Sequence, residues 1–215
     1  KKEQDAIKRL QSTKSKVSAH YLIKKNGEIF SLVNEKFRAW HAGVSFWDNC
    51  TDINSTSIGI ELDYNPNGQN NKFTKKMIKS LINLINKLKK KYNIKSDYIL
   101  GHSDIAPFRK IDPGINFPWE LLSNANIVVK NKRVNKKKTI ILKQWFKKNN
   151  IRSKKKIIYF ILSYIGYDTK GISRKRYLYL KLINTYNTRF IRDRKKNKLI
   201  SISIDIVLKQ FFNFL

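Results

Sequence analysis

The segment at residues 73–92 constrains the fold most, because its apolar residues recur with the 3.6-residue spacing of an α-helix. These residues are Phe73, Met77, Ile78, Leu81, Ile82, Ile85, Leu88 and Tyr92. Lys and Asn occupy the positions between them, which predicts a helix with one apolar face that must pack against another element. Thr74 or a neighbour can cap its first turn.

Short extended segments flank this helix. Residues 20–33 (HYLIKKNGEIFSLV) hold two apolar runs about an Asn-Gly, which supplies positive φ angles and predicts a β-hairpin. The segment TSIGIEL at 56–62 predicts a β-branched strand, and Asp97–Gly101 predicts a short buried strand that ends just before His102. Residues 3–12 predict a short helix and 66–71 a loop. Strands that alternate with helices indicate an α/β domain with a mixed sheet.

The character of the sequence changes near residue 126. A basic stretch without a clear pattern is followed by segments of helical length at 139–149, 154–165, 175–187 and 201–214. We therefore predict an α/β domain at 1–125, a basic linker at 126–137 and a small all-helical domain at 138–215.

The net charge is +31, of which +22 lies in residues 126–215. This charge suits an anionic partner such as nucleic acid or an anionic wall polymer. Compositional drift is the other explanation. Lys, Asn and Ile are abundant throughout, so Lys could have replaced other surface residues without selection for a ligand. There is no Arg-rich helix, zinc knuckle or RNA-binding signature, so we expect no specific nucleic-acid partner. The single cysteine, Cys50, excludes an intramolecular disulfide and a Cys-based zinc site.

The segment GHSDIAPFRKIDPG at 101–114 is the strongest candidate for a site. His102 and Asp112 lie at the two ends of one loop, where Pro113 and Gly114 set a turn. An imidazole and a carboxylate suit zinc, although the same pair could form a simple ion pair on a loop. Lys110 could reach the same cavity and stabilise an oxyanion, or be one more surface lysine.

Two further residues, Glu61 and His41, are candidates for chemistry. Glu61 lies between Ile60 and Leu62 on a predicted strand and could transfer protons in a cleft or face solvent at an edge. His41, in AWHAG, indicates a pocket wall or a close approach of the backbone. His20 opens a hairpin strand, and we expect it to pack structurally.

Several motifs occur in one order over residues 1–122: SAHYLI, GEIFSLV, RAWHAG, NSTSIGIEL, GHSDIAPFRKIDPG and FPW. In this order they resemble the zinc-dependent N-acetylmuramoyl-L-alanine amidases of the AmpD/AmiD type. The resemblance implies a central mixed β-sheet flanked by helices. It also implies zinc-dependent hydrolysis of the amide between N-acetylmuramic acid and L-alanine, in peptidoglycan or muropeptides.

The resemblance assigns roles residue by residue. His102 and Asp112 fall on two zinc-ligand positions, Glu61 on the catalytic glutamate and Lys110 on the lysine that assists at the oxyanion. His41 is then expected to contact the substrate.

One ligand of the family is not matched. The third zinc ligand is a His in an H-Y-T-like motif on the first core strand, and this chain holds no such motif. His20-Tyr21 resembles it superficially, but His20 aligns with a later segment whose histidine is not a ligand. We therefore expect the given chain to start after that strand. Either the full gene product continues upstream of Lys1, or the gene is degrading. A catalytically inactive amidase that binds the cell wall is one alternative function, and a basic nucleic-acid-binding protein is the other.

The helical segments after residue 126 resemble loosely the small peptidoglycan-binding-like domain of the AmiD branch. This favours the AmiD type, in the periplasm or cell envelope and with any lipoprotein anchor upstream of Lys1, over the cytoplasmic AmpD type. We expect a monomer whose partner is peptidoglycan or a muropeptide.

Overall fold

The computed structural model describes residues 16–65, 72–129, 136–172, 175–191 and 204–214 of the 215. The helix predicted at 3–12 and the loop predicted at 66–71 lie outside them. The chain forms two compact units, each described by itself below. Unit 1 comprises Lys1–Ser45, Thr51–Lys95 and Asn116–Pro118, and unit 2 comprises Phe46–Cys50, Ser96–Ile115 and Trp119–Leu215.

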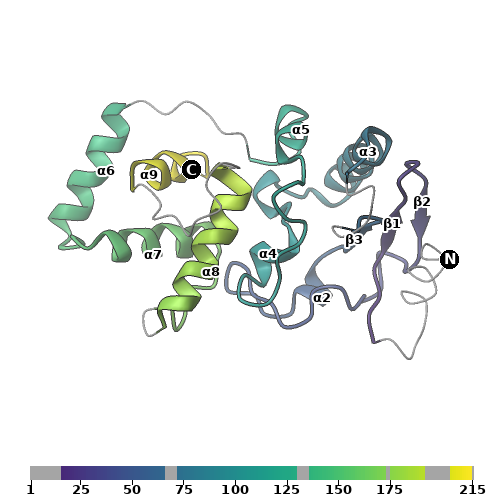
Figure 1. The fold of residues 1–215 in the computed structure, drawn as a ribbon, viewed down its shortest axis with the longest axis horizontal. Coiled ribbons are helices and arrows are strands. Elements are labelled where there is room, and N and C mark those ends of the chain that lie inside the picture. The colour runs from purple at the N-terminus through teal and green to yellow at the C-terminus, as the bar shows by residue number, and fades with distance from the viewer. Residues whose placement is uncertain (1–15, 66–71, 130–135, 173–174, 192–203, 215) are drawn as a thin grey trace. The chain divides into compact units, whose positions relative to one another are not determined.

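Unit 1 contains a mixed sheet of three strands in the order β2-β1-β3 (Figure 1). The central strand β1 (Tyr21–Ile23) pairs antiparallel with β2 (Ile29–Ser31) and parallel with β3 (Ile60–Leu62). The predicted mixed sheet is therefore confirmed. The strand predicted at 56–62 is shorter than expected, because its first residue ends helix α2 (Ile53–Thr56).

The turn between β1 and β2 confirms the predicted hairpin but differs in detail. Among its described residues only Gly27 has a positive φ, of 89°, and its N–H donates to the Lys24 carbonyl at 2.9 Å. Asn26 contributes instead through its side chain, which accepts a hydrogen bond from the Glu28 N–H at 3.0 Å. A Cβ atom at Gly27 would lie 2.9 Å from the Ser80 hydroxyl, so the close approach of this turn to the next helix requires glycine.

That helix, α3 (Lys75–Tyr92), follows the predicted periodicity. The Thr74 hydroxyl accepts a hydrogen bond from the Met77 N–H at 3.1 Å, as expected of an N-cap. The helix ends at Asn93, whose φ of 52° is left-handed. Its buried stripe packs towards β1 and consists of Met77, Ile78, Leu81, Leu84, Ile85 and Leu88.

Unit 2 starts differently from the prediction. The strand predicted at Asp97–Gly101 is wrong, because Ser96–Tyr98 form a 3-10 turn, η2, and Tyr98 is 47% exposed. A three-residue apolar run is too short for periodicity to identify as a strand. Two short helices follow, α4 (His102–Ile105) and α5 (Trp119–Asn124).

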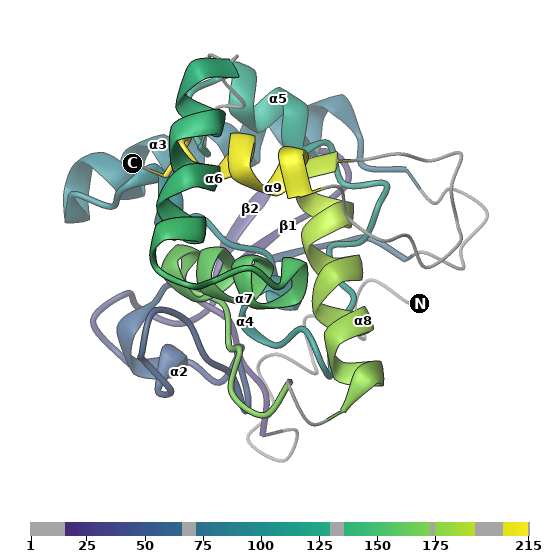
Figure 2. The same ribbon diagram turned by 90° about the vertical axis from the view of Figure 1, so that its left-hand side faces the viewer.

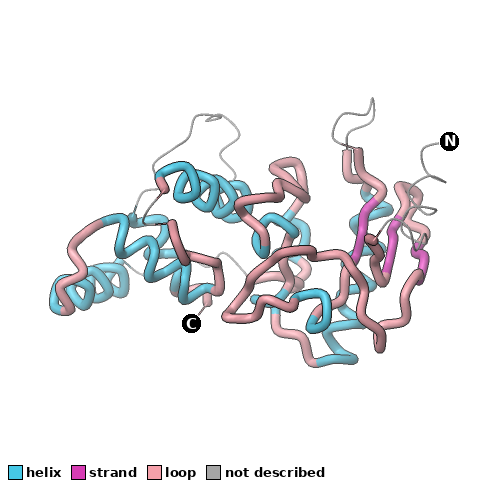
Figure 3. Tube along the Cα trace, turned by 90° about the horizontal axis from the view of Figure 1, so that it is seen from below, coloured by secondary structure: helices cyan, strands magenta, loops and turns pink. Residues whose placement is uncertain are grey.

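The C-terminal part of unit 2 is helical, as predicted (Figures 2 and 3). Its elements are α6 (Lys136–Lys148), α7 (Lys154–Ile165), α8 (Arg176–Tyr186), the π-helical turn η3 (Asn187–Ile191) and α9 (Ile204–Phe211). Helix α9 packs against α7 and α6. Contacts group residues 96–115 with these helices in one unit. Within the described part of the chain, no helix is both long and apolar enough to cross a bilayer.

Candidate active site

The loop from Gly101 to Gly114 brings His102 and Asp112 together in unit 2. The His102 Nδ1 lies 3.0 Å from the Asp112 Oδ2. The Ser103 N–H donates to the Asp112 carbonyl at 2.8 Å, which ties the end of the loop to the first turn of α4. The juxtaposition that the sequence predicted is therefore present, and a role for the pair in binding zinc stays a prediction.

Glycine at position 101 lets this loop close. A Cβ atom there would lie 2.7 Å from the Pro113 Cδ, which is closer than packed atoms approach, and 3.2 Å from the Trp119 ring. Lys110 lies in the same loop and is half-buried, and its N–H donates to the Ala106 carbonyl at 2.9 Å. The backbone path from His102 to Asp112 is thus held by internal hydrogen bonds.

The charges around Asp112 favour its ionised form. Partial removal from water acts to raise the pKa of this carboxyl, but the hydrogen bond and charge of His102, with the charge of Lys110, outweigh that effect. The pKa of Asp112 therefore lies below its ordinary value. Its side chain is 56% exposed, so the carboxylate is both ionised at neutral pH and accessible to a cation.

The helix that carries His102 has a buried anchor, Asp104. One carboxylate oxygen of Asp104 accepts a hydrogen bond from the Gly101 N–H at 2.7 Å, and the other accepts one from the Tyr167 hydroxyl at 2.7 Å. Arg189 forms an ion pair with the same carboxylate. Sequence analysis did not single out Asp104, although a carboxylate three residues after the N-cap, here Gly101, is a capping signal.

Glu61 lies at the centre of β3 in unit 1 and is exposed. The Tyr21 hydroxyl donates to Glu35, which also contacts Lys91 and Tyr92 in the last turn of α3. The face of β1 that carries Tyr21 is therefore the face that α3 covers. Because side chains alternate along a strand, Leu22 and its cross-strand neighbour Glu61 lie on the opposite face.

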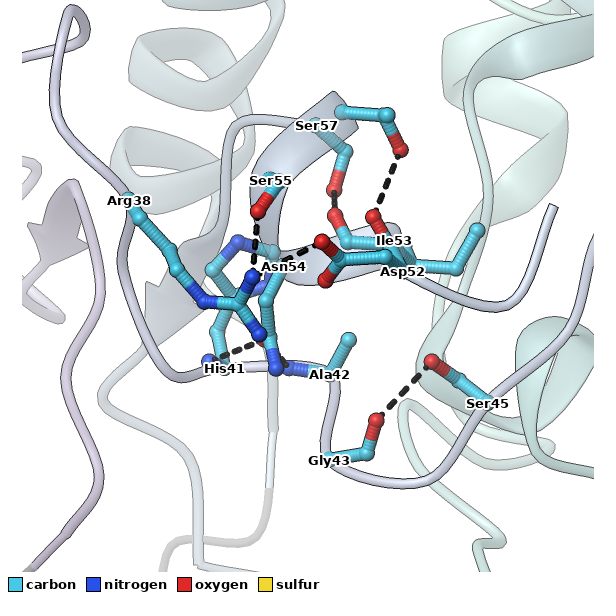
Figure 4. A network of polar contacts seen from close by, with 11 residues as sticks. Arg38, His41, Ala42, Gly43, Ser45, Asp52, Ile53, Asn54, Ser55 and Ser57 are labelled. Carbon is cyan, nitrogen blue, oxygen red and sulfur yellow. Dashed lines mark hydrogen bonds and ion pairs between the residues drawn. The ribbon is translucent and has the colours of Figure 1, made fainter.

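His41 packs against the backbone that leads into β3. A Cβ atom at Gly59 would lie 2.3 Å from the His41 Cγ, so this contact requires glycine. Asn54 in α2 fixes the His41 segment, because its side-chain oxygen accepts hydrogen bonds from the His41 N–H at 3.0 Å and the Ala42 N–H at 2.8 Å (Figure 4). The predicted close approach is present, and Asn54 is a residue that sequence reasoning missed.

His20 is structural, in line with expectation. It is 1% exposed, its Nδ1 accepts a hydrogen bond from the Gly59 N–H at 3.0 Å, and its Nε2 lies 3.0 Å from the Phe37 carbonyl oxygen. The carbonyl can only accept, so the Nε2 carries the proton. With both ring nitrogens engaged, His20 offers no lone pair to a metal.

The donor set fits zinc in kind. His102 and Asp112 supply an imidazole nitrogen and a carboxylate oxygen, both of which zinc accepts. Catalytic zinc sites usually take three protein ligands. Among the described residues, no three His, Cys, Asp or Glu side chains gather at one point. These residues therefore offer a pair of zinc donors rather than a full set.

A family model described as N-acetylmuramoyl-L-alanine amidase matches residues 1–115. The N-acetylmuramoyl-L-alanine amidase AmiD of Escherichia coli (strain K12) is 41% identical over 129 residues, which make up 54% of this chain and 46% of that protein. The 1,6-anhydro-N-acetylmuramyl-L-alanine amidase AmpD of Haemophilus influenzae is 49% identical over 107 residues, 49% of this chain and 56% of that protein. The chain thus spans about half the length of these curated relatives.

Two solved structures are similar over nearly the whole chain. AmiD from E. coli, in complex with the substrate anhydro-N-acetylmuramic acid-L-Ala-D-gamma-Glu-L-Lys, matches with a TM-score of 0.76 and 26% identity. That match covers 97% of this chain and 82% of AmiD. AmpDh3 from Pseudomonas aeruginosa matches with a TM-score of 0.76 and 25% identity, over 95% of this chain and 84% of AmpDh3. Both matches extend beyond the sheet to the C-terminal helices.

Proposed function

The chain belongs to the N-acetylmuramoyl-L-alanine amidase family, and from this premise we propose that it hydrolyses the amide between N-acetylmuramic acid and L-alanine. The substrate is peptidoglycan or a muropeptide released from it. The observation that carries the proposal is the His102–Asp112 pair, held at 3.0 Å within the region that the family model matches.

His102 and Asp112 are the residues that would hold zinc. A bound zinc ion supplies Lewis-acid polarisation of the substrate carbonyl and a lowered pKa for the attacking water. The exposure of the Asp112 side chain, 56%, supports this assignment, because a cation can reach its carboxylate.

Glu61 is the proposed general base and acid. Its exposed position on the sheet face opposite α3 supports this role, since a base must be open to water and substrate. It would take a proton from the attacking water and pass it to the amine of L-alanine as the amide breaks. Lys110 would stabilise the negative charge that develops on the carbonyl oxygen. His41, fixed by Asn54 and Gly59, would form part of the substrate-binding surface.

The test is release of stem peptide from purified peptidoglycan and from an anhydro-muropeptide, followed by mass spectrometry. We expect the full-length protein to release stem peptide, and we expect a chelator to abolish this release and zinc to restore it. Glu61→Gln should lower the rate by about 10²-fold or more, the usual contribution of a general acid–base group. Glu28→Gln is the matched control, because Glu28 is an exposed glutamate whose partner is Lys24 of the hairpin.

A Glu61→Gln protein that keeps the wild-type rate would remove Glu61 from the mechanism. The second candidate function is binding to the cell wall without hydrolysis. It is favoured because the described residues supply two zinc donors, His102 and Asp112, and no group of three. It predicts that the wild-type chain sediments with peptidoglycan yet releases no peptide at any zinc concentration.

We propose the cell envelope as the place of action, since the match to AmiD includes the C-terminal helices. Cell fractionation tests this directly, and recovery in the cytoplasm would favour the AmpD type of role on soluble muropeptides.

A further inference from the structure

The anchor of helix α4 joins the His102 loop to the C-terminal helices. Asp104 is 1% exposed, and two of its partners are distant in sequence. Tyr167 comes just after α7, and Arg189 lies in η3. They are 63 and 85 residues from Asp104. All of these residues belong to unit 2.

Arg189 contacts helix α4 and also the segments on either side of the loop at residues 101–114. Its Nη1 pairs with Asp104, and its Nη2 donates to the Ile99 carbonyl at 2.7 Å, just before the loop begins. Its guanidinium also lies 4.3 Å from the ring centroid of Trp119, which starts α5 after the loop. One side chain therefore contacts the segments that enter and leave residues 101–114.

Further contacts bind the same loop to the same helices. Lys181 in α8 donates to the Phe108 carbonyl at 2.9 Å. The Tyr167 ring packs edge-on against Trp47, at 4.9 Å between centroids, and the neighbouring Phe46 N–H donates to the Ile105 carbonyl at 2.8 Å. The end of α4 is thus also tied to the rest of unit 2.

A buried ion pair of this kind fixes a geometry. Charges removed from water contribute little net stability unless further hydrogen bonds satisfy them. Here the Asp104 carboxylate accepts hydrogen bonds from the Gly101 N–H and the Tyr167 hydroxyl in addition to Arg189. Such a network tolerates one arrangement of its members, and His102 directly precedes Ser103 and Asp104 in the helix that the network orients.

We propose that Asp104 is a positioning residue for the His102–Asp112 pair, and that Tyr167 and Arg189 make the C-terminal helices part of the support of the active site. The C-terminal helices then influence catalysis by orienting α4, whether or not they also bind the cell wall. The role in the reaction rests on the proposed amidase function, whereas the ordering of α4 does not.

The test compares Tyr167→Phe with Tyr186→Phe in the full chain. Both variants remove one buried hydroxyl from neighbouring rings, whose centroids lie 6.3 Å apart. Only the Tyr167 hydroxyl bonds Asp104, while the Tyr186 hydroxyl has no hydrogen-bond partner within the described residues. A third variant, Ile158→Val, removes one methyl from the buried face of α7 and lowers the stability of the same unit without touching the network.

Hydrogen exchange is the first readout. We expect amide protection across residues 101–112 to fall about tenfold in Tyr167→Phe, beyond any fall elsewhere in unit 2, and to stay unchanged in Tyr186→Phe. Equal exchange in both tyrosine variants, or a uniform loss that Ile158→Val reproduces, would overturn the proposal.

Zinc affinity, measured by competition with a chromogenic chelator, is the second readout. Tyr167→Phe should weaken zinc binding several-fold, as loss of an outer support does at metal sites, while the two controls bind as the wild type does. An unchanged affinity in Tyr167→Phe would contradict the link from Asp104 to the donor pair. If the wild-type chain binds no zinc and releases no peptide, the amidase proposal fails, and the exchange data alone then decide whether the helices order α4.

Discussion

The His41 segment in unit 1 and the His102 loop in unit 2 are both held by one buried polar side chain, but the two anchors differ in charge. Asn54 is neutral and accepts two backbone hydrogen bonds from residues 12 and 13 positions away. Asp104 is charged and depends on Arg189, 85 positions away. The first anchor is completed within one short stretch of chain, whereas the second exists only once distant elements have assembled.

The order of the His41 segment therefore depends on nearby residues, whereas the order of the His102 loop depends on the assembly of the whole unit. A neutral amide that loses a partner leaves an unsatisfied hydrogen bond, which costs about 1–3 kcal/mol. A buried carboxylate that loses its cation leaves an isolated charge in a low-dielectric interior, which costs more. The His102 loop should therefore be the more sensitive of the two to changes far from it.

Removing the cation of the charged anchor should have the largest effect. Arg189→Met leaves the Asp104 carboxylate buried without its counter-charge and should lower the free energy of unfolding by about 3–5 kcal/mol, measured by urea denaturation. Adding Asp104→Asn to this variant removes the isolated charge and should restore part of the loss. A loss below about 1 kcal/mol for Arg189→Met would mean that the pair is not buried as described.

Removing the neutral anchor should have an intermediate effect. Asn54→Ala deprives the His41 and Ala42 N–H groups of their acceptor and should cost about 2 kcal/mol in the same assay. Ser45→Ala is the control, since the Ser45 hydroxyl donates to the Gly43 carbonyl of the same segment and its loss should cost under about 1 kcal/mol. If Asn54→Ala lowers the free energy of unfolding as much as Arg189→Met does, charge does not distinguish the two anchors.

Unit 1 also contains a charged anchor, Glu35. The pH dependence of the free energy of unfolding can therefore compare a charged anchor with the neutral Asn54 in the same unit. Hydrogen bonds from Lys91, Tyr21 and Tyr92 lower the pKa of Glu35 from 4.5 to about 2. Its folded pKa lies below the unfolded value, so its contribution to stability is complete above about pH 4.5 and is lost as the pH falls towards 2.

We expect Glu35→Gln to cost about 1 kcal/mol at pH 7, a value reduced by screening because the Lys91 side chain is 61% exposed. The difference from wild type should shrink as unfolding is measured at successively lower pH down to 3. The cost of Asn54→Ala should not vary with pH over this range. A pH-independent cost for Glu35→Gln would show that its carboxylate charge plays no part.

Features whose signals lie close together in sequence were predictable. The stripe and cap of α3, the Asn-Gly hairpin and the His102–Asp112 pair each fall within a single helix, hairpin or loop. In each case a repeat, a turn dipeptide or a rigid proline-containing loop leaves few alternatives for the backbone.

The anchors were not predictable in the same way. No periodicity links Asp104 to Tyr167 or Arg189, because the three meet only through packing of separate elements. The strand expected before His102 was wrong for a related reason, since Tyr98-Ile99-Leu100 is apolar but its packing partners decide its backbone. Local propensity alone does not identify such contacts.

The pairing of β1 with β3 spans three residues on each strand, so its alignment is one discrete choice. A slip of one residue would place Glu61 on the face that α3 covers and turn Ile60 and Leu62 to the opposite face. Burying an ionised carboxylate under a helix is costly, so the misaligned sheet would be less stable than the observed one. Glu61 therefore favours the observed alignment of β1 and β3 over its one-residue alternative, because only the observed alignment leaves the carboxylate exposed.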